Sequence, residues 1–374
     1  MFMKRVLTWL ALLAFPFSAG ATQPILIGQT ADLSSVSSAQ MKDFNAAAKV
    51  YLHAVNKAGG IKGRPIQLIH LDDAMSAHLA SVNARELIEE QKVLAIFGTR
   101  GTDPTEAVLA VADAARVPVI APISGADTVR KSPVAFPVRA SYRLELDTMF
   151  KQMAFAPVRL AMLVQNDKFG HPLARFTQTR LQQQYPTISL VKQAFFDRKC
   201  TDMRAQVNTI LASQPNAVIA LCNPTSCEAF LREIQKQTRH TGATRPTIYQ
   251  TSISDAYSQF SAMKADFPGG NPFTQVLPDP VHTSAPLAKE YRAALKGQGI
   301  PINYRSFEGY VAAKVLVMAL AKAATLTREG LIQSMEQMGT RDLGGFTVHY
   351  AKGNHLGSTF VDLVTLNSTG QIVH

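Results

Sequence analysis

The sequence predicts an α/β protein made of two doubly wound, parallel-sheet lobes joined by three crossovers. The first observation is size, because a chain of 374 residues with 47% hydrophobic content is too long for one small core and suits two domains. The second is an alternation of short apolar runs with longer periodic runs, which is typical of βα units around a parallel sheet. The third is that this rhythm restarts after Ser141, which indicates a second lobe.

The N-terminal segment has the features of a cleaved secretory signal peptide. Lys4 and Arg5 form a positive region, Val6–Phe17 is apolar, and small residues stand at Ala19 and Ala21, the positions that a signal peptidase recognises. We therefore expect cleavage after Ala21 and a secreted mature protein. A retained membrane anchor is the less favoured alternative, because the apolar stretch is short.

In the first lobe, four strands alternate with helices within about a hundred residues. The strands are expected at Ile25–Gly28, Ile66–Leu71, Leu94–Phe97 and Val117–Ile120, and the helices at Asp43–Lys57, Leu79–Gln91 and Asp103–Ala115. Gly59 and Gly60 end the first of these helices, since glycine commonly follows a helix C-terminus.

The second lobe repeats the pattern, and a helical block and terminal strands follow it. Its strands are expected at Arg159–Val164, Leu190–Phe196, Ala217–Leu221 and Thr247–Tyr249, and its helices at Glu145–Phe155, Pro172–Gln184, Asp202–Ser213 and Ser226–Gln237. The C-terminal part adds helices Pro286–Lys296, Phe307–Ala324 and Arg328–Met338, and strands Phe346–Tyr350 and Thr359–Leu366.

This order suggests that the chain returns to the first lobe and then crosses again. We place the three crossovers near Val138–Ser141, Gln275–Pro278 and Gly344–Thr347. The predicted organisation is therefore a signal peptide at 1–21, a first lobe at 22–138 plus 278–344, and a second lobe at 139–277 plus 345–374.

The net charge of +11 falls to +9 once Lys4 and Arg5 are removed, and it is spread along the chain. Neither a run of five or six basic residues nor basic residues interleaved with aromatic ones occurs, which argues against nucleic-acid binding. A mild positive field favours anionic ligands.

The three cysteines are Cys200, Cys222 and Cys227. A secreted chain permits a disulfide, and we expect one disulfide and one free thiol, with the pairing undetermined. The Cys222–Cys227 spacing lacks the second pair of ligands that a zinc site needs.

Enzyme signatures are absent from the sequence, including the glycine-rich nucleotide loops, the H-E-x-x-H zinc motif and the G-x-S-x-G elbow. Asp72 and Asp73 follow a strand, where helix capping explains them better than catalysis. We therefore predict a protein that is not an enzyme and has no metal or cofactor. A secreted α/β enzyme stays open as a minor alternative, because Cys222 and Cys227 lie near the carboxyl end of a strand.

Three small, hydroxyl-rich loops follow strands of the first lobe and precede helices: 34–38, 99–102 and 124–126. In a doubly wound sheet, ligands bind outside the carboxyl ends of the strands. Backbone N–H groups at helix N-termini together with Ser and Thr hydroxyls suit a carboxylate. We therefore expect these loops to form an anion-binding pocket.

Several segments form distinctive motifs. The most specific is Asn56–Arg64, an Asn-x-x-Gly-Gly-Ile-x-Gly-Arg pattern followed by a strand and Asp72-Asp73. Further motifs are Arg116–Pro122, the loop Asn166–Gly170 and the helix start Phe307–Tyr310. With these motifs the mature chain resembles the periplasmic leucine/isoleucine/valine-binding protein family of ABC importers.

This resemblance implies the type I periplasmic binding protein fold, with a small-molecule ligand in the cleft between the lobes. It also implies hinge closure and delivery of the ligand to an ABC permease in the inner membrane. We accordingly expect a periplasmic protein, a monomer with no nucleic-acid partner. A ligand sensor of the same fold that feeds a signalling partner is the alternative.

Ligand contacts follow from the resemblance position by position. Thr102 matches the residue that holds the ligand carboxylate, 124–126 match a loop with further contacts, and Phe169 matches an aromatic that closes over the ligand. The expected ligand-binding residues are Ser37, Ser38, Arg100, Gly101, Thr102, Ser124, Gly125, Ala126, Phe169, Asn223 and Ser252.

The sequence departs from the family at the ammonium site of amino-acid binders. Ser252 lies near the place of the glutamate that contacts the ammonium, and Asp255 substitutes only if its loop shifts. A buried ammonium needs an anionic partner. Arg100 lies in the carboxylate loop and could clamp an anion. We therefore predict a small carboxylate-bearing ligand, either an amino acid or a related organic or aromatic acid.

Overall fold

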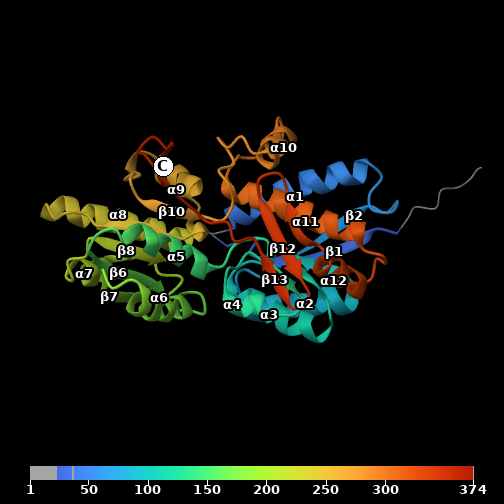
Figure 1. Cartoon of the computed structure of the whole chain (residues 1–374), viewed down its shortest axis with the longest axis horizontal. Coiled ribbons are helices and arrows are strands. Elements are labelled where there is room, and N and C mark those ends of the chain that lie inside the picture. The colour runs from blue at the N-terminus through green and yellow to red at the C-terminus, as the bar shows by residue number, and fades with distance from the viewer. Residues whose placement is uncertain (1–22, 36–37, 374) are drawn as a thin grey trace, which may run out of the picture.

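The computed structural model describes residues 23–35 and 38–373, and it shows two α/β lobes side by side (Figure 1). The α/β fold class predicted from the sequence is confirmed. The expected signal peptide and its cleavage site after Ala21 lie outside the described residues.

The sheet of lobe one has the strand order β2-β1-β3-β4-β5, and all its pairs are parallel. The apolar side chains of its strands form the buried core of the lobe. The strands are β1 (Ile25–Ala31), β2 (Ile66–Asp72), β3 (Ala95–Phe97), β4 (Val119–Ile120) and β5 (Ala135–Phe136).

Helices from both ends of the chain pack on this sheet. From the N-terminal half come α1 (Ala39–Lys57), α2 (Ala77–Arg85), which continues into a π-helical turn (Glu86–Glu90), α3 (Thr102–Ala114) and α4 (Asp127–Arg130); α10 (Pro286–Leu295), α11 (Tyr304–Lys322) and α12 (Arg328–Glu336) follow later. Gly309 lets α11 approach α1 closely, because a Cβ there would lie 2.0 Å from the carbonyl oxygen of Phe44. Among the described residues, no helix is long and apolar enough to span a bilayer.

Lobe two is built on a sheet with the order β15-β14-β10-β9-β8-β6-β7. Its strands are β6 (Val158–Gln165), β7 (Ile188–Phe196), β8 (Ala217–Leu221), β9 (Thr247–Gln250), β10 (Pro272–Gln275), β14 (Asp362–Leu366) and β15 (Ile372–Val373). The strands from β7 to β10 run parallel, whereas β14 and β15 add antiparallel pairs at one edge.

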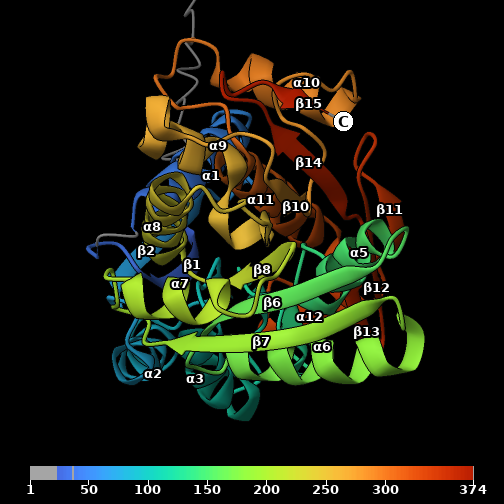
Figure 2. The same cartoon turned by 90° about the vertical axis from the view of Figure 1, so that its left-hand side faces the viewer.

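Helices cover both faces of this second sheet (Figure 2). One face packs against α5 (Tyr142–Met153) and α6 (Gly170–Gln184). The other packs against α7 (Arg204–Leu211), α8 (Pro224–Thr241) and α9 (Ala256–Met263), with short 3₁₀ turns at Ser252–Ser254 and Lys264–Asp266.

A small antiparallel sheet packs on lobe one, so the third crossover lies later in the chain than expected. Its strands are β11 (Gly339–Asp342), β12 (Thr347–Ala351) and β13 (Asn354–Gly357). The Tyr350 hydroxyl donates to the Pro137 carbonyl at 2.9 Å, and His355 stacks on Phe136 with ring centroids 4.1 Å apart.

The chain therefore leaves lobe one for the last time after β13, and the crossover expected at 344–347 is corrected to the segment between β13 and β14. The strand pattern of residues 346–350 marks a strand correctly. It does not say which lobe that strand covers, because both lobes offer an apolar surface for it. The first crossover lies between β5 and α5, and the second lies between β10 and α10.

Candidate functional site

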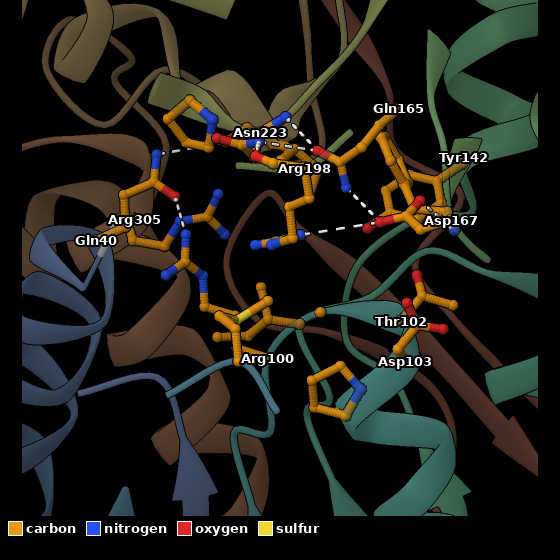
Figure 3. Close-up of a pocket in the computed structure, with 17 residues that line it drawn as sticks. Gln40, Arg100, Thr102, Asp103, Tyr142, Gln165, Asp167, Arg198, Asn223 and Arg305 are labelled. Carbon is orange, nitrogen blue, oxygen red and sulfur yellow. Dashed lines mark hydrogen bonds and ion pairs between the residues drawn. The ribbon is translucent and has the colours of Figure 1, made fainter. Parts of the chain in front are cut away.

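A cavity lies between the two lobes, at the carboxyl ends of strands from both sheets (Figure 3). The empty space between its walls, including the part open to solvent, is about 610 Å3. That volume is an upper bound for a ligand, because part of it is open solvent. The position is the one that the strand-end rule for doubly wound sheets predicts.

Three arginines from distant segments line this cavity. Arg100 follows β3, Arg305 lies in the first turn of α11, and Arg198 follows β7, so two come from lobe one and one from lobe two. Figure 3 shows their guanidinium groups close together. Only Arg100 was predicted from the sequence, because nothing local to Arg198 or Arg305 marks them as its neighbours.

The arginines of lobe one are anchored by buried acceptors. Arg100 donates to the carboxylate of Asp32 at 3.0 Å and to the side-chain oxygen of Gln40 at 3.1 Å. Arg305 forms an ion pair with Glu308 and donates to the carbonyl of Ser252 at 3.3 Å. Its Nε–H is buried and has no acceptor within the described part of the chain.

The cations also act on one another. Burial, followed by the charges of Arg305 and Arg198 and opposed by that of Asp32, lowers the pKa of Arg100 to about 10. An anion placed among the three guanidinium groups would relieve this repulsion. Planar guanidinium groups also match the geometry of a carboxylate.

Two carboxyl groups, from Asp103 and Asp167, line the other side of the cavity. Asp103 lies in the first turn of α3, on lobe one. Asp167 lies on lobe two and accepts hydrogen bonds from the backbone N–H groups of Phe169 at 2.9 Å and Gly170 at 3.0 Å. Burial, and then the charge of Asp167, raises the pKa of Asp103. Neither aspartate was predicted from the sequence: Asp167 lies inside the Asn166–Gly170 motif, and Asp103 directly follows the predicted contact Thr102.

Some of the expected ligand contacts meet at this cavity, and others do not. Ser124 hydrogen-bonds Thr102 at 3.1 Å, and a Cβ on Gly125 would lie 2.7 Å from the backbone nitrogen of Tyr142. Tyr142 thus covers the loop at 124–126, which was expected to contact the ligand. Arg100, Gly101, Thr102, Phe169 and Asn223 line the cavity, whereas Ser38, Ser124, Gly125 and Ala126 do not, and Ser37 lies outside the described residues.

Neither residue considered for an ammonium contact at 252–255 faces the cavity. Ser252 is buried, and both its backbone N–H, at 2.8 Å, and its hydroxyl, at 2.9 Å, donate to Glu145. Asp255 is fully buried and accepts from the backbone N–H groups of Ser258 at 3.0 Å and Arg305 at 3.2 Å. Its carboxylate caps α9 and is therefore occupied by the backbone.

Asn223 holds the segment that carries Arg198. As the N-cap of α8, its side-chain oxygen accepts from the Ser226 N–H at 3.2 Å. Its amide donates to the Arg198 carbonyl at 3.0 Å and to the Gln165 side chain at 2.9 Å. The disulfide that forms between Cys222 and Cys227 closes the same turn, and Cys200 keeps a free thiol.

We therefore expect Asn223→Ala to weaken ligand binding by about 1 kcal/mol, or about fivefold, because the loop that positions Arg198 loses a hydrogen bond. Isothermal titration calorimetry measures the change. Asn216→Ala is the matched control, because Asn216 precedes β8 at the end remote from the cavity and bonds the Arg159 N–H at 2.9 Å. Equal losses in both variants would show that Asn223 acts on stability alone.

A buried ion network joins the cavity to the first crossover. Arg139 is 1% exposed and forms ion pairs with Glu145 of lobe two at 3.6 Å and Glu308 of lobe one at 3.8 Å. It also donates to the Ser252 hydroxyl. Because Glu308 also pairs with Arg305, a continuous series of ion pairs connects Arg139, at the first crossover, with Arg305, at the cavity.

The lobes also contact each other directly. At the cavity, the side-chain amide of Gln40, on α1, donates to the carbonyl of Ile253 at 3.3 Å. Outside the cavity, Lys168 pairs with Glu106 across the lobes at 2.9 Å. Within the described part of the chain, no group of three or more His, Cys, Asp or Glu side chains is placed to hold a metal ion.

Two lobes, three connecting segments and a charged cavity between the strand ends define a hinged, two-lobed solute-binding protein. The chain belongs to the periplasmic binding protein family, whose profile matches residues 24–371. This confirms the resemblance drawn from the sequence motifs. Membership implies a periplasmic location, and the family consists of binding proteins rather than enzymes.

Known proteins agree with this assignment. Leu/Ile/Val-binding protein homolog 7 of Brucella suis biovar 1 is 24% identical over 298 residues, which cover 73% of this chain and 71% of that protein. A substrate-binding periplasmic protein from Ralstonia solanacearum is 25% identical, with a TM-score of 0.85 over 93% of this chain and 99% of that one. A possible leucine/isoleucine/valine-binding protein from Rhodopirellula baltica is 22% identical, with a TM-score of 0.85 over 95% and 97% of the two chains.

Proposed function

We propose that this protein is the periplasmic receptor of an ABC importer and that it binds a small carboxylate-bearing organic molecule between its lobes. The observation that carries the proposal is the convergence of Arg100, Arg198 and Arg305 on one cavity from two lobes. The bound ligand would then be delivered to a permease in the inner membrane by the closed, monomeric receptor.

The arrangement of the arginines supports ligand-driven closure. Arg100 and Arg305 belong to lobe one and Arg198 to lobe two, so bringing the lobes together brings like charges together. A carboxylate between them offsets that repulsion and accepts hydrogen bonds from both sides. Binding and closure would therefore favour each other, as in other hinged receptors.

The rest of the cavity suits an organic body. Phe169 and Tyr142 pack edge to face with ring centroids 5.0 Å apart, and Ile123 and Met75 add apolar surface. The family relatives named for leucine, isoleucine and valine make amino acids a natural part of the carboxylate class to be tested.

A thermal-shift screen of mature protein, refolded to remove any bound ligand, tests the proposal. The panel holds amino acids, aliphatic and aromatic acids, dicarboxylates, and the amide of each acid. A ligand at a hundred times its Kd should stabilise the folded state by about 2.7 kcal/mol, which raises the melting temperature. We expect shifts with carboxylates and none with the matching amides. Equal shifts with acid and amide, or none with any carboxylate, would contradict the proposal.

A further inference from the structure

A second hollow lies at the edge of the lobe-one sheet that is opposite the cavity between the lobes. It is lined by residues 23–26 at the start of β1, Arg64 before β2, residues 92–94 before β3, and residues 326–328 at the start of α12. Figure 1 shows α12 and the start of β1 toward the end of lobe one that is remote from lobe two. Since β1 spans seven residues between the two edges, the hollow and the cavity are roughly 20 Å apart.

The charged side chains that line this hollow are all cationic. Arg64, Lys92 and Arg328 line it, and no aspartate or glutamate does. Within the described residues, none of the three forms an ion pair with a carboxylate. Glu90 and Glu329 are close in the sequence, but both are exposed and neither lines the hollow. The hollow therefore carries positive charge that the chain does not neutralise.

Backbone carbonyls hold the two guanidinium groups in place without neutralising them. Arg64 donates through Nε to the carbonyl of Gln23 at 2.8 Å and through Nη2 to that of Pro24 at 3.1 Å. Arg328 donates through Nε at 3.2 Å and through Nη2 at 3.1 Å to the carbonyl of Val93. Donors that are already fixed lose little conformational freedom when an anion binds, so they suit an anion site.

We propose that this hollow is a second anion site, which binds a phosphate group independently of the cavity between the lobes. Arg64, Lys92 and Arg328 come from three segments, so their N–H groups reach the hollow from different directions. A tetrahedral phosphate offers oxygens in several directions, whereas a planar carboxylate offers two in one plane. The N-terminus of α12, with Thr327 as its N-cap, adds the positive end of a helix dipole.

The phosphate group belongs either to a free ion or to a phospholipid head group, because both present the same oxygens. The hollow opens to solvent at the outer end of lobe one, so a head group can reach it without any movement of the lobes. The net positive charge of the chain attracts an anionic membrane surface. If the proposed function holds, a lipid bound here would keep the receptor at the membrane that contains its permease.

Titration calorimetry with inorganic phosphate, and with acetate at the same ionic strength, tests the site. We expect phosphate to bind at least about fivefold more tightly than acetate, and Lys92→Gln to weaken phosphate binding at least about fivefold. The Lys92 side chain donates no hydrogen bond within the described part of the chain, so this variant should keep its melting temperature. Repeating the titrations with Arg198→Ala separates phosphate bound in the cavity, and the loss caused by Lys92→Gln should persist there.

Lys131→Gln is the matched control, because Lys131 is exposed on lobe one outside the hollow and the change removes the same charge. Sedimentation with vesicles of phosphatidylglycerol, and with vesicles of phosphatidylcholine, identifies the source of the phosphate. Vesicle binding that is lost in Lys92→Gln alone assigns the site to a lipid, and phosphate binding lost in this way without vesicle binding assigns it to a free ion.

Three results would overturn this inference. They are acetate that binds as tightly as phosphate, equal losses in Lys92→Gln and Lys131→Gln, and no binding of either phosphate or vesicles. Each leaves the proposed function standing, because that function concerns the cavity at the other edge of the sheet.

Discussion

Arg198→Ala is expected to weaken binding of the best carboxylate ligand on the order of 100-fold, or about 3 kcal/mol. Arg198 is the arginine that lobe two brings to the cavity, and the ion pair that the structure gives it, to Asp167, is long at 4.0 Å. Its side chain is 33% exposed, and Asp167 keeps the hydrogen bonds from the N–H groups of Phe169 and Gly170 when the arginine is removed. The loss should therefore appear in ligand affinity and leave the unligated protein folded, which distinguishes this variant from substitutions of Arg100.

Calorimetric titration gives the affinity, and the melting temperature without ligand reports folding. Arg204→Ala is the control, because Arg204 lies on the same segment, is 70% exposed and pairs with Asp202 in solvent. Its pair is exposed to solvent, so its removal should change stability little and binding not at all. Unchanged affinity in Arg198→Ala would contradict the proposal that arginines from both lobes bind the ligand carboxylate.

Arg139→Met is expected to lower the free energy of unfolding by about 3–5 kcal/mol near neutral pH, the usual cost of removing one partner from a buried ion pair. Arg139 is 1% exposed, and its loss leaves Glu145 and Glu308 without their shared cation. Methionine fills most of the volume, so the effect measures charge rather than a cavity. Urea denaturation, followed by circular dichroism, measures it.

The defect should shrink as the pH falls. Burial raises the pKa of the Glu145 carboxyl, with Arg139 opposing the shift, so the variant should raise it further. A carboxyl whose pKa is higher in the folded than in the unfolded state adds stability below its unfolded pKa, and that stability is lost as the pH rises through the folded pKa. The variant should therefore recover part of its loss near about pH 5.

Arg143→Met provides the control for this effect. Arg143 lies four residues further along the chain, at the start of α5, is 53% exposed and pairs with Asp127 at 2.5 Å. We expect a loss of no more than about 1 kcal/mol at either pH. A loss in Arg139→Met that equals the control would show that the network contributes little to the hinge.

Local sequence patterns predicted the βα rhythm of both lobes, because the periodicity of strands and helices depends only on residues that are close in the sequence. The helix over Asp43–Lys57 and the strand over Ala217–Leu221 both lie within elements of the structure. The strand at residues 346–350 was also found, but its lobe was not, since an apolar strand face does not specify which surface it covers. The third crossover was therefore misplaced.

The candidate site was likewise predicted only in part from the sequence. The loop at 99–102 was predicted because it follows a strand, and it does line the cavity. The loop at 124–126 satisfied the same rule, yet Tyr142 covers it, and that contact comes from a different lobe.

By itself, the sequence determined the α/β class, the two-lobed organisation and the family, all of which rest on short-range periodicity and contiguous motifs. Only the tertiary structure decided that Arg100, Arg198 and Arg305 meet at one side of the cavity and that Asp103 and Asp167 line the other. The physical reason is that charges act through space. Side chains on distant segments become neighbours only when the two lobes fold and come into contact, and no local pattern in the sequence predicts those contacts.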